Sequence, residues 1–468
     1  MKSISFLQSR HSYAPPEGQG HVYTNTSLWT AASRVIEAGG DVAQICDENL
    51  RYCEPEGDAV GINLLGAPYI PTVRSKIESL LGKRPIVGGQ IVNGLAEVQT
   101  LIGQQGSQLQ TLFGQNVVNG NNDTELCAYL GIDPAKMPDV LETSLIPAYE
   151  RISDEDMYEY LSREISFFLS RGCAKRCNFC AAQCGTKEEY RDFNVSEKDL
   201  RYLVRRAQSL GLKELDMYLS SLDIMQTPDK LKRFALIVQR IKKENPDFEI
   251  KMRGLAGAPY FVKANRKNPD AIREIVKAGL YSIGFGVDGG TPEVWKRERK
   301  GNTEDDCIDS ILLTREKYGI TPEILMVFGH QKETEESLKA ALDFTKEMNE
   351  KYDAVPRPHI AKDIVPGSRY WANNLKDNET TDEERADRAM RIAVLMNDPD
   401  YFLTLDFARL PSSVSHSDPI LRRLIDKYAK SIAELPGNTT QLLDPIGPEF
   451  SNAKFIETLR NDIGKFDR

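Results

Sequence analysis

The stretch RGCAKRCNFC, residues 171–180, contains three cysteines in a C-x3-C-x2-C spacing. It follows the apolar run ISFFL, residues 165–169, which predicts a buried strand. Cys173, Cys177 and Cys180 are therefore expected in a loop just past the carboxyl end of a strand, where α/β sheets bind ligands. Thiolates suit iron–sulfur clusters or zinc, and four of them complete a [4Fe–4S] cluster. Three thiolates would leave one iron open to a small ligand.

This spacing, with the aromatic Phe179 just before the last cysteine, resembles the signature of the radical S-adenosyl-L-methionine (SAM) superfamily. The resemblance implies that the three cysteines hold a [4Fe–4S] cluster and that the amino and carboxylate groups of SAM chelate the open iron. One electron from the cluster would then cleave SAM to a 5′-deoxyadenosyl radical, which abstracts hydrogen from a substrate. An electron donor such as a flavodoxin or ferredoxin is implied as a partner.

A structural zinc site is the alternative for the same loop, with Cys184 as the fourth ligand. Structural zinc usually ties together a small module with little core, whereas this loop lies within a long alternation of strands and helices. We therefore favour the cluster. Two interpretations of Cys184 remain: it is either a fourth metal ligand or a small buried apolar residue.

Length and composition limit the remaining possibilities. The chain has 468 residues, so two or three domains are expected. A formal net charge of −9 argues against the basic face of a nucleic-acid-binding protein. No apolar run reaches the ~18 residues of a membrane span, and the amino terminus MKSISFLQSR has too short an apolar part for a signal peptide. Eight cysteines, three of them closely spaced, fit a metal site in a reducing compartment, so a soluble cytoplasmic protein is expected.

The first 145 residues predict a doubly wound, Rossmann-like parallel sheet. Apolar runs that predict strands alternate there with segments of helical spacing. The predicted strands are residues 4–7, 42–46, 59–64, 85–89 and 116–120, and the predicted helices are residues 27–38 and 73–81.

Glycines and small polar residues gather where these strands end, and glycine lets a backbone approach a ligand closely. The segments DAVGIN at 58–63, PIVGG at 85–89 and VVNGN at 117–121 resemble the domain that binds cobalamin in B12-dependent radical SAM enzymes. The acidic pair that follows the fifth strand in that family is replaced by Asn121-Asn122, with Glu125 further on. The resemblance implies cobalamin contacts from Ser12, Asn63, Leu64, Gly66, Gly88, Gly89, Gln90, Asn119, Gly120 and Asn121.

The lower axial histidine of cobalamin is expected to be missing. The D-x-H-x-x-G loop of His-ligated cobalamin proteins is absent, and His11 and His21 lie in a different context. The methylthiotransferases are a further alternative, because three cysteines of their first domain hold a second cluster. Cys46, Cys53 and Cys127 are the candidates here, but we interpret them as core or incidental thiols. The C-terminal region is not evidently basic, unlike that of the tRNA-modifying methylthiotransferases.

Residues 146–375 predict a partial (β/α)6 barrel like that of the superfamily, with its chemistry at the carboxyl ends of the strands. The resemblance implies that Ser220 and Ser221 receive the SAM amino group, that Arg253 pairs with the SAM carboxylate and that Asp288 accepts from the ribose. His330 replaces a family proline and is either a general base or a structural residue. The six predicted strands are residues 165–169, 214–219, 249–254, 281–287, 323–328 and 359–364.

Residues 376–468 are expected to form a helical C-terminal domain that covers the barrel mouth, with helices over 382–396 and 418–433. The expected function is that of a B12-dependent methyltransferase acting on an unactivated carbon of a small-molecule or peptide precursor in natural-product biosynthesis. Radical rearrangement, oxidation or cyclisation by the same architecture stays open, as does a methylthiotransferase-like enzyme. A redox sensor with an iron–sulfur or zinc site is the alternative outside enzymes. The catalytic residues are left unknown.

Overall fold

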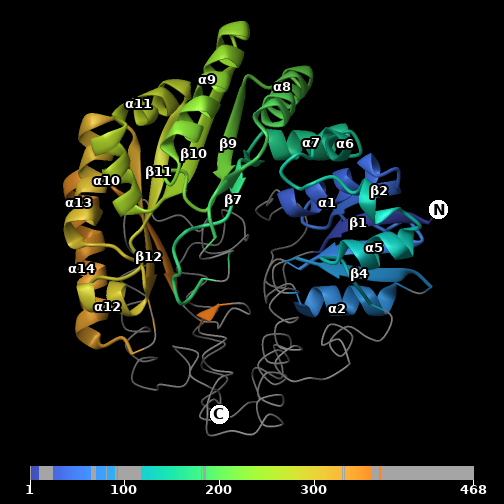
Figure 1. Cartoon of the computed structure of the whole chain (residues 1–468), viewed down its shortest axis with the longest axis horizontal. Helices are drawn as coiled ribbons and strands as arrows, with labels where there is room; N and C mark the ends of the chain where they lie inside the picture. Colours follow the sequence, from blue (N-terminus) through green and yellow to red (C-terminus); the bar gives the residue numbers. More distant parts are fainter. Residues whose placement is uncertain are drawn as a thin grey trace, which may run out of the picture.

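The computed structural model describes residues 2–9, 25–64, 70–80, 82–89, 92, 117–180, 182, 186–328, 330, 332–360 and 368–369. Within these residues the chain forms two parallel sheets with helices packed against them, side by side in the view of Figure 1. The predicted α/β architecture, a Rossmann-like sheet followed by a partial barrel, is confirmed. The predicted C-terminal helices lie outside the described residues.

The first sheet has the strand order β2-β1-β3-β4-β5, and every neighbouring pair is parallel. All five predicted strands are present. The order reverses between β1 and β3, which is the switch point where sheets of this topology bind ligands. The elements are β1 (Ser3–Gln8), β2 (Asp41–Asp47), β3 (Ala59–Asn63), β4 (Arg84–Gly88) and β5 (Val118–Asn119), with helices α1 (Thr26–Glu37), α2 (Ile70–Ser79) and α5 (Asp123–Leu130).

The cysteines of this domain do not form a set of three ligands. Cys46 and Cys53 are core residues, as one of the two predicted alternatives has it, but they are joined in a disulfide and are not thiols. They belong to the apolar cluster on one face of the sheet, whereas the free thiol of Cys127 is buried in the core on the other face. Because Cys127 lies in a different apolar cluster from Cys46 and Cys53, these cysteines do not hold a second cluster together.

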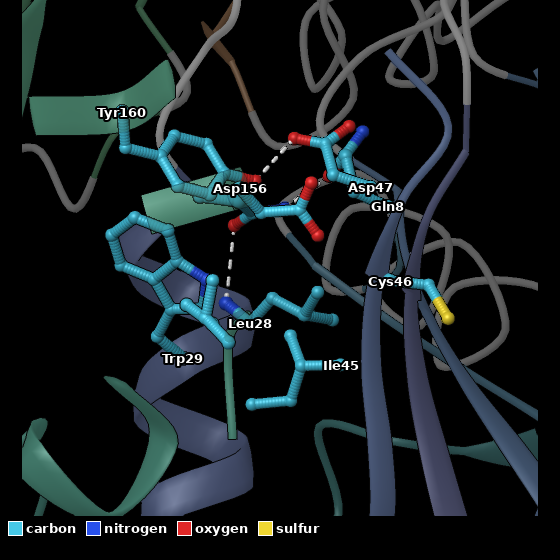
Figure 2. A pocket seen from close by; sticks show the side chains of 10 residues that line it. Gln8, Leu28, Trp29, Ile45, Cys46, Asp47, Asp156 and Tyr160 are labelled. Atoms are coloured by element: carbon cyan, nitrogen blue, oxygen red, sulfur yellow. Dashed lines mark hydrogen bonds between the residues drawn. The ribbon is translucent and has the colours of Figure 1, made fainter. Parts of the chain in front are cut away.

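Two short helices lead from the first sheet to the second, α6 (Ile146–Tyr149) and α7 (Asp154–Leu161). The ring of Trp29 in α1 packs edge-on against Tyr149 and Tyr160, with centroids 5.4 and 5.1 Å away. The Tyr160 hydroxyl donates to Asp47 at 2.7 Å, which ties α7 to the carboxyl end of β2 (Figure 2). The two domains therefore share one continuous apolar core.

The second sheet has the order β13-β12-β11-β10-β9-β6, and all of its pairs are parallel. It is the expected six-stranded partial barrel. Its strands are β6 (Glu164–Phe168), β9 (Glu214–Ser220), β10 (Glu249–Ala256), β11 (Leu280–Gly286), β12 (Thr321–Phe328) and β13 (Val355–Ile360). The helices between them are α8 (Phe193–Ser209), α9 (Pro228–Glu244), α10 (Ala258–Lys267), α11 (Pro269–Ala278), α12 (Pro292–Arg297), α13 (Glu304–Leu312) with a π-helical end at Leu313–Lys317, and α14 (Glu335–Tyr352).

The last strand begins earlier than predicted. The sequence predicts it over residues 359–364, but β13 covers Val355–Ile360 and includes Pro356 and Pro358. Proline cannot donate to a ladder and normally argues against a strand. Here β13 pairs only with β12 among the described strands, so the side that lacks N–H donors faces no described neighbour.

The two faces of the barrel sheet differ in polarity. Leu215, Met217 and Leu219 of β9 are fully buried in the core with the helices. The alternating positions of the same strand, Asp216, Tyr218 and Ser220, point to the opposite face. Parallel strands are usually apolar on both faces. A polar inner face therefore marks the barrel interior as the place for a ligand.

Candidate functional site

The three cysteines lie in a loop that begins on a short hairpin. Strand β7 (Ser170–Arg171) pairs antiparallel with β8 (Glu189–Tyr190), and the Thr186 N–H donates to the carbonyl of Cys173 at 3.1 Å. Gly172 has φ +86°, and a Cβ there would lie 2.5 Å from the carbonyl oxygen of Lys187. The hairpin therefore requires glycine immediately before the first cysteine.

Cys173, Cys177 and Cys180 are free thiols, as cluster ligands must be. Burial raises the pKa of Cys173 and of Cys177, and each also interacts electrostatically with Cys180. Within the described residues no three His, Cys, Asp or Glu side chains converge on a single metal ion. In a cubane cluster each thiolate binds a different iron, so three coupled thiols on one loop fit that group. Cys184, the candidate fourth zinc ligand, lies outside the described residues.

The cysteine loop is fastened to the mouth of the barrel on two sides. The Ala174 N–H donates to Oε1 of Gln226 at 2.8 Å, and the Asn178 amide donates to the carbonyl of Arg297 at 2.6 Å. The Asn178 backbone N–H donates to the carbonyl of Glu298. The loop is thus held between the segment after β9 and the end of α12.

A buried ion pair lies beside Cys177. Lys300 pairs directly with Asp288, and its ammonium lies 5.7 Å from the centre of the Phe179 ring. Burial lowers the pKa of Lys300, but Asp288 and Cys177 outweigh burial, so its pKa is above the ordinary value. Asp288, predicted to contact the SAM ribose, is therefore already bonded to a cation, and its ribose contact stays a prediction.

A lysine of the cysteine loop and an aspartate of the segment after β9 approach each other at Gly257, the residue that follows β10. A Cβ on Gly257 would lie 2.6 Å from Nζ of Lys175 and 2.8 Å from Oδ2 of Asp223. Burial raises the pKa of Asp223 to about 7, although Lys175 and two backbone amides lower it. Burial and the charge of Lys300 lower the pKa of Lys175. Opposite charges therefore meet at one point beside the cysteine loop.

Ser220 and Ser221, predicted to receive the SAM amino group, lie at the end of β9. The Ser221 hydroxyl donates to Glu188 at 3.2 Å, and its oxygen accepts the N–H of Asp223. Ser170 and Thr227 also donate to Glu188, which therefore links the cysteine hairpin to the segment after β9. The contact of the two serines with SAM stays a prediction.

Arg253, predicted to pair with the SAM carboxylate, is already surrounded by carboxylates. Its Nε and Nη2 donate to Glu164 at 2.7 and 2.8 Å, and its Nη1 donates to Glu323 at 3.3 Å. Arg357 and Ser282 also donate to Glu323. Binding a SAM carboxylate would require Arg253 to release one of these partners, so this role stays a prediction.

His330 is fully buried, and its ring packs against Phe179 with centroids 5.1 Å apart. Burial lowers the pKa of His330 to about 4, so the imidazole is neutral near pH 7. Its carboxylate neighbour is Glu298, 3.9 Å from Nδ1. These contacts favour a structural role for His330 over that of a general base, because its imidazole ring packs against the Phe179 ring of the cysteine loop.

The first domain gathers the described cobalamin candidates at the carboxyl ends of its strands. Asn121 accepts the N–H of Gly89 at 2.8 Å and donates to its carbonyl at 2.7 Å, and the Leu64 N–H donates to the carbonyl of Gly88. Gly89 has φ +115°, and a Cβ there would lie 2.5 Å from Oδ1 of Asn63 and from the carbonyl oxygen of Leu64.

The remaining candidates of this set continue the same edge. The Asn119 side chain accepts the N–H of Asn121 at 3.0 Å, and Gly120 lies against the backbone of Gly88. Such a cradle of glycines and amides fits a large flat ligand that lies close to the backbone. Ser12, Gly66 and Gln90 lie outside the described residues, as do His11 and His21.

Sequence reasoning missed Lys175, Asp223 and Lys300. Each has a signal in its position, because Lys175 lies within the cysteine spacing and Asp223 follows the end of β9. Lys300 lies just after α12, at the mouth of the barrel. The fold was needed to show that these charges meet around the cysteine loop.

Comparison with known proteins agrees with this site. Residues 167–345 match the model of the radical SAM superfamily. An uncharacterised methyltransferase of Pyrococcus horikoshii is 26% identical over 239 residues, which cover 49% of this chain and 47% of that protein. The match therefore spans about half of the relative's length.

Two solved structures share the fold of nearly the whole chain. The radical SAM methyltransferase TsrM of Kitasatospora setae, solved with tryptophan and a SAM analogue, has a TM-score of 0.57 and 14% identity over 99% of this chain and all of that chain. The cobalamin-dependent radical SAM enzyme OxsB, solved with aqua-cobalamin and SAM, has a TM-score of 0.53 and 15% identity over 99% of this chain and 67% of that chain. The cysteine-bearing barrel therefore lies in the segment that matches the radical SAM superfamily, residues 167–345, and the chain shares its fold with the radical SAM enzymes TsrM and OxsB.

Proposed function

We propose that the protein is a cobalamin-dependent radical SAM methyltransferase that acts on an unactivated carbon of a small molecule or peptide. The observation that carries the proposal is the pairing of two sites in one chain. A loop of three free cysteines lies at the mouth of the barrel, and a cradle of glycines and amides lies at the switch point of the first sheet. Membership of the superfamily implies SAM and an iron–sulfur cluster.

Cys173, Cys177 and Cys180 would hold the cluster, whose chemistry is to supply one electron for the cleavage of SAM. The chain's own residues position this loop, with Gln226 and Asn178 fastening its two sides. The cations Lys175 and Lys300 lie close enough to stabilise thiolates, because each interacts electrostatically with Cys177.

Cobalamin, which supplies a methyl group, would be held by the described candidates at the carboxyl ends of the strands of the first sheet. These are Asn63, Leu64, Gly88, Gly89, Asn119, Gly120 and Asn121. The absence of a lower axial histidine stays a prediction. A pocket lies between the carboxyl ends of these strands and helix α7 (Figure 2). Its polar lining includes Gln8, Asn25 and Asp47. The names of the Pyrococcus relative and of TsrM support methyl transfer over rearrangement, oxidation or cyclisation.

The test is anaerobic reconstitution of the full chain with iron, sulfide and hydroxocobalamin, followed by turnover with methyl-labelled SAM and an electron donor. Candidate acceptors are small indole and other aromatic amino acids and short peptides. The proposal predicts bound cobalamin and the label in the acceptor. Cleavage of SAM to 5′-deoxyadenosine without bound cobalamin would contradict it and leave a radical enzyme that needs no B12.

No helix in the described part of the chain is long and apolar enough to cross a membrane. Action in the cytoplasm, with a flavodoxin or ferredoxin as electron donor, remains part of the proposal. Cell fractionation with an antibody against the chain tests the first, and turnover supported by a purified flavodoxin tests the second.

A further inference from the structure

We propose that Asn25 and Gln8 are positioning residues of the first domain, which turn the side-chain amide of Asn63 so that its oxygen accepts a hydrogen bond from an amide at the edge of a bound corrin ring. The inference rests on the proposed function, because it requires a corrinoid at the carboxyl ends of the first sheet. It assigns a role to two residues that act through Asn63, and it fixes which end of Asn63 faces the ligand.

The side-chain amides of Gln8, Asn25 and Asn63 form one chain of hydrogen bonds. The amide of Asn63, at the end of β3, donates to Oδ1 of Asn25 at 2.8 Å. Asn25 in turn donates to Oε1 of Gln8 at the end of β1, and Gln8 donates to the carbonyl of Ser9 at 2.9 Å. The three residues are 2%, 3% and 4% exposed in chain order, so water competes little for these bonds.

The direction of this chain is fixed by backbone groups at two points. The N–H of Leu28 can only donate, and it donates to Oδ1 of Asn25 at 3.1 Å where Asn25 caps helix α1. The carbonyl of Ser9 can only accept. Reversing the amide of Asn25 or Gln8 would bring two donors or two acceptors together, and an unpaired buried polar group costs free energy. Asn63 must therefore turn its NH2 group toward Asn25.

The oxygen of Asn63 is thereby turned toward the cradle of glycines and amides. A Cβ on Gly89 would lie 2.5 Å from this oxygen, so the absence of that side chain leaves room beside it. The hydrogen bonds among the described residues bring no donor to it. Cobalamin carries amides around its corrin ring, and their N–H groups are donors that this oxygen can accept. A reversed Asn63 would present its NH2 group instead and would pair equally well with the carbonyl of an amide or of an ester.

The experiment measures the affinity of the reconstituted full chain for two corrinoids by absorption titration. Cobinamide carries amides around the ring, whereas heptamethyl cobyrinate carries methyl esters, which have no N–H donors. Wild type should prefer cobinamide, and Asn25→Ser should lower that preference about fivefold, the contribution of one hydrogen bond. The serine hydroxyl still caps α1 but is too short to hold Asn63 and Gln8. Asn25→Asp keeps an oxygen for both Leu28 and Asn63 and should retain the preference.

Asn268→Ser is the matched control, because Asn268 caps helix α11 of the barrel through the same contact, with the N–H three residues on. It should leave both affinities unchanged. The thermal midpoint shows whether each variant is folded, and Asn63→Leu, which removes the amide and should lower the preference by the same factor, replaces Asn25→Ser if that variant is not.

The outcomes separate this inference from the proposed function. Wild-type protein that binds neither corrinoid would overturn the proposed function. Wild-type protein that binds both without preference would overturn this inference alone. So would an Asn25→Ser variant that binds both corrinoids as wild type does or loses affinity for both equally, because a merely structural role of the amide chain would not distinguish an amide from an ester.

Discussion

In the middle of the barrel sheet Arg253 is held by Glu164 and Glu323, whereas beyond the carboxyl end of β9 Asp223 keeps one buried oxygen that no donor of the described residues reaches. Both regions bury charge on the polar inner face of the same sheet. The first region, which we call the floor, consists of Glu164, Arg253, Ser282, Glu323 and Arg357. Glu164 accepts two hydrogen bonds from Arg253, and Glu323 accepts from Arg253, Ser282 and Arg357. The second, the mouth, consists of Lys175, Asp223, Asp288, Lys300 and the three cysteines.

The difference teaches where to expect function. A satisfied buried network stabilises a fold or specifies its geometry, whereas a partly satisfied one costs free energy unless a ligand completes it. We therefore interpret the floor as a network that stabilises the fold and the mouth as a binding site. This agrees with the rule that barrel enzymes place their chemistry at the carboxyl ends of their strands.

The largest effect is expected at the mouth, from Cys177→Ala. Losing one of three thiolates should remove nearly all bound iron and all SAM cleavage, measured by metal analysis and by 5′-deoxyadenosine formation. Cys307→Ala is the matched control, because Cys307 is a free and fully buried cysteine of the barrel core. Its burial raises the pKa of its thiol to about 12, and it lies in helix α13, outside the cysteine loop. Equal iron in the two variants would contradict the cluster assignment.

The floor is tested by Arg253→Met. Removing the guanidinium leaves Glu164 without its cation and Glu323 with Arg357 as its remaining cation. Breaking a buried pair in this way costs about 3–5 kcal/mol of folding free energy. Urea unfolding of wild type and variant measures the loss. The affinity of folded variant protein for SAM should stay within about threefold of wild type. A stable variant with weakened SAM binding would restore the role of Arg253 as the partner of the SAM carboxylate.

Asp47 of the first domain adds a third kind of buried carboxylate to the comparison. It is buried and hydrogen-bonded through both oxygens, but it has no cationic partner. It accepts from Tyr160 and from both nitrogens of Asn49, yet burial raises its pKa to about 6. The folded state therefore binds more protons than the unfolded state between about pH 4 and pH 6. Folding stability should fall as pH rises through this window, by up to about 3 kcal/mol.

Asp47→Asn should remove this dependence, since the amide does not ionise. The measurement is the free energy of unfolding of wild type and variant from pH 4 to pH 7. The curves should approach or cross as pH rises, with wild type losing stability relative to the variant. Parallel curves would show that Asp47 titrates at its ordinary pKa.

The smallest effect is expected from Lys251→Met, on the same strand as Arg253. Lys251 pairs with Glu214 at 2.7 Å, but both side chains are substantially exposed. Exposed ion pairs contribute about 0–1 kcal/mol to stability, so the free energy of unfolding should change by less than about 1 kcal/mol. A loss of unfolding free energy as large as that of Arg253→Met would contradict the claim that the floor contributes more to stability than an exposed ion pair does.

Much of the fold could be predicted from the sequence because local signals and the final structure agree. Helix α1, predicted over residues 27–38 from its apolar spacing, covers Thr26–Glu37. Strand β13 was misplaced because its prolines hid it, and the disulfide of Cys46 and Cys53 was missed because spacing alone does not reveal pairing. The cysteine loop could be predicted from its motif. The meeting of Lys175 with Asp223 could not, because the two residues approach only through the packing of β9, β10 and the loop.

One measurement tests the central claim, that the mouth is an open SAM site beside a cluster. It is the electron paramagnetic resonance spectrum of the reduced, reconstituted full chain with and without SAM. The account predicts about four iron atoms per chain, a reduced-cluster signal, and a clear change of that signal when SAM is added. A signal that SAM does not alter, or a protein that holds zinc and no cluster, would contradict it.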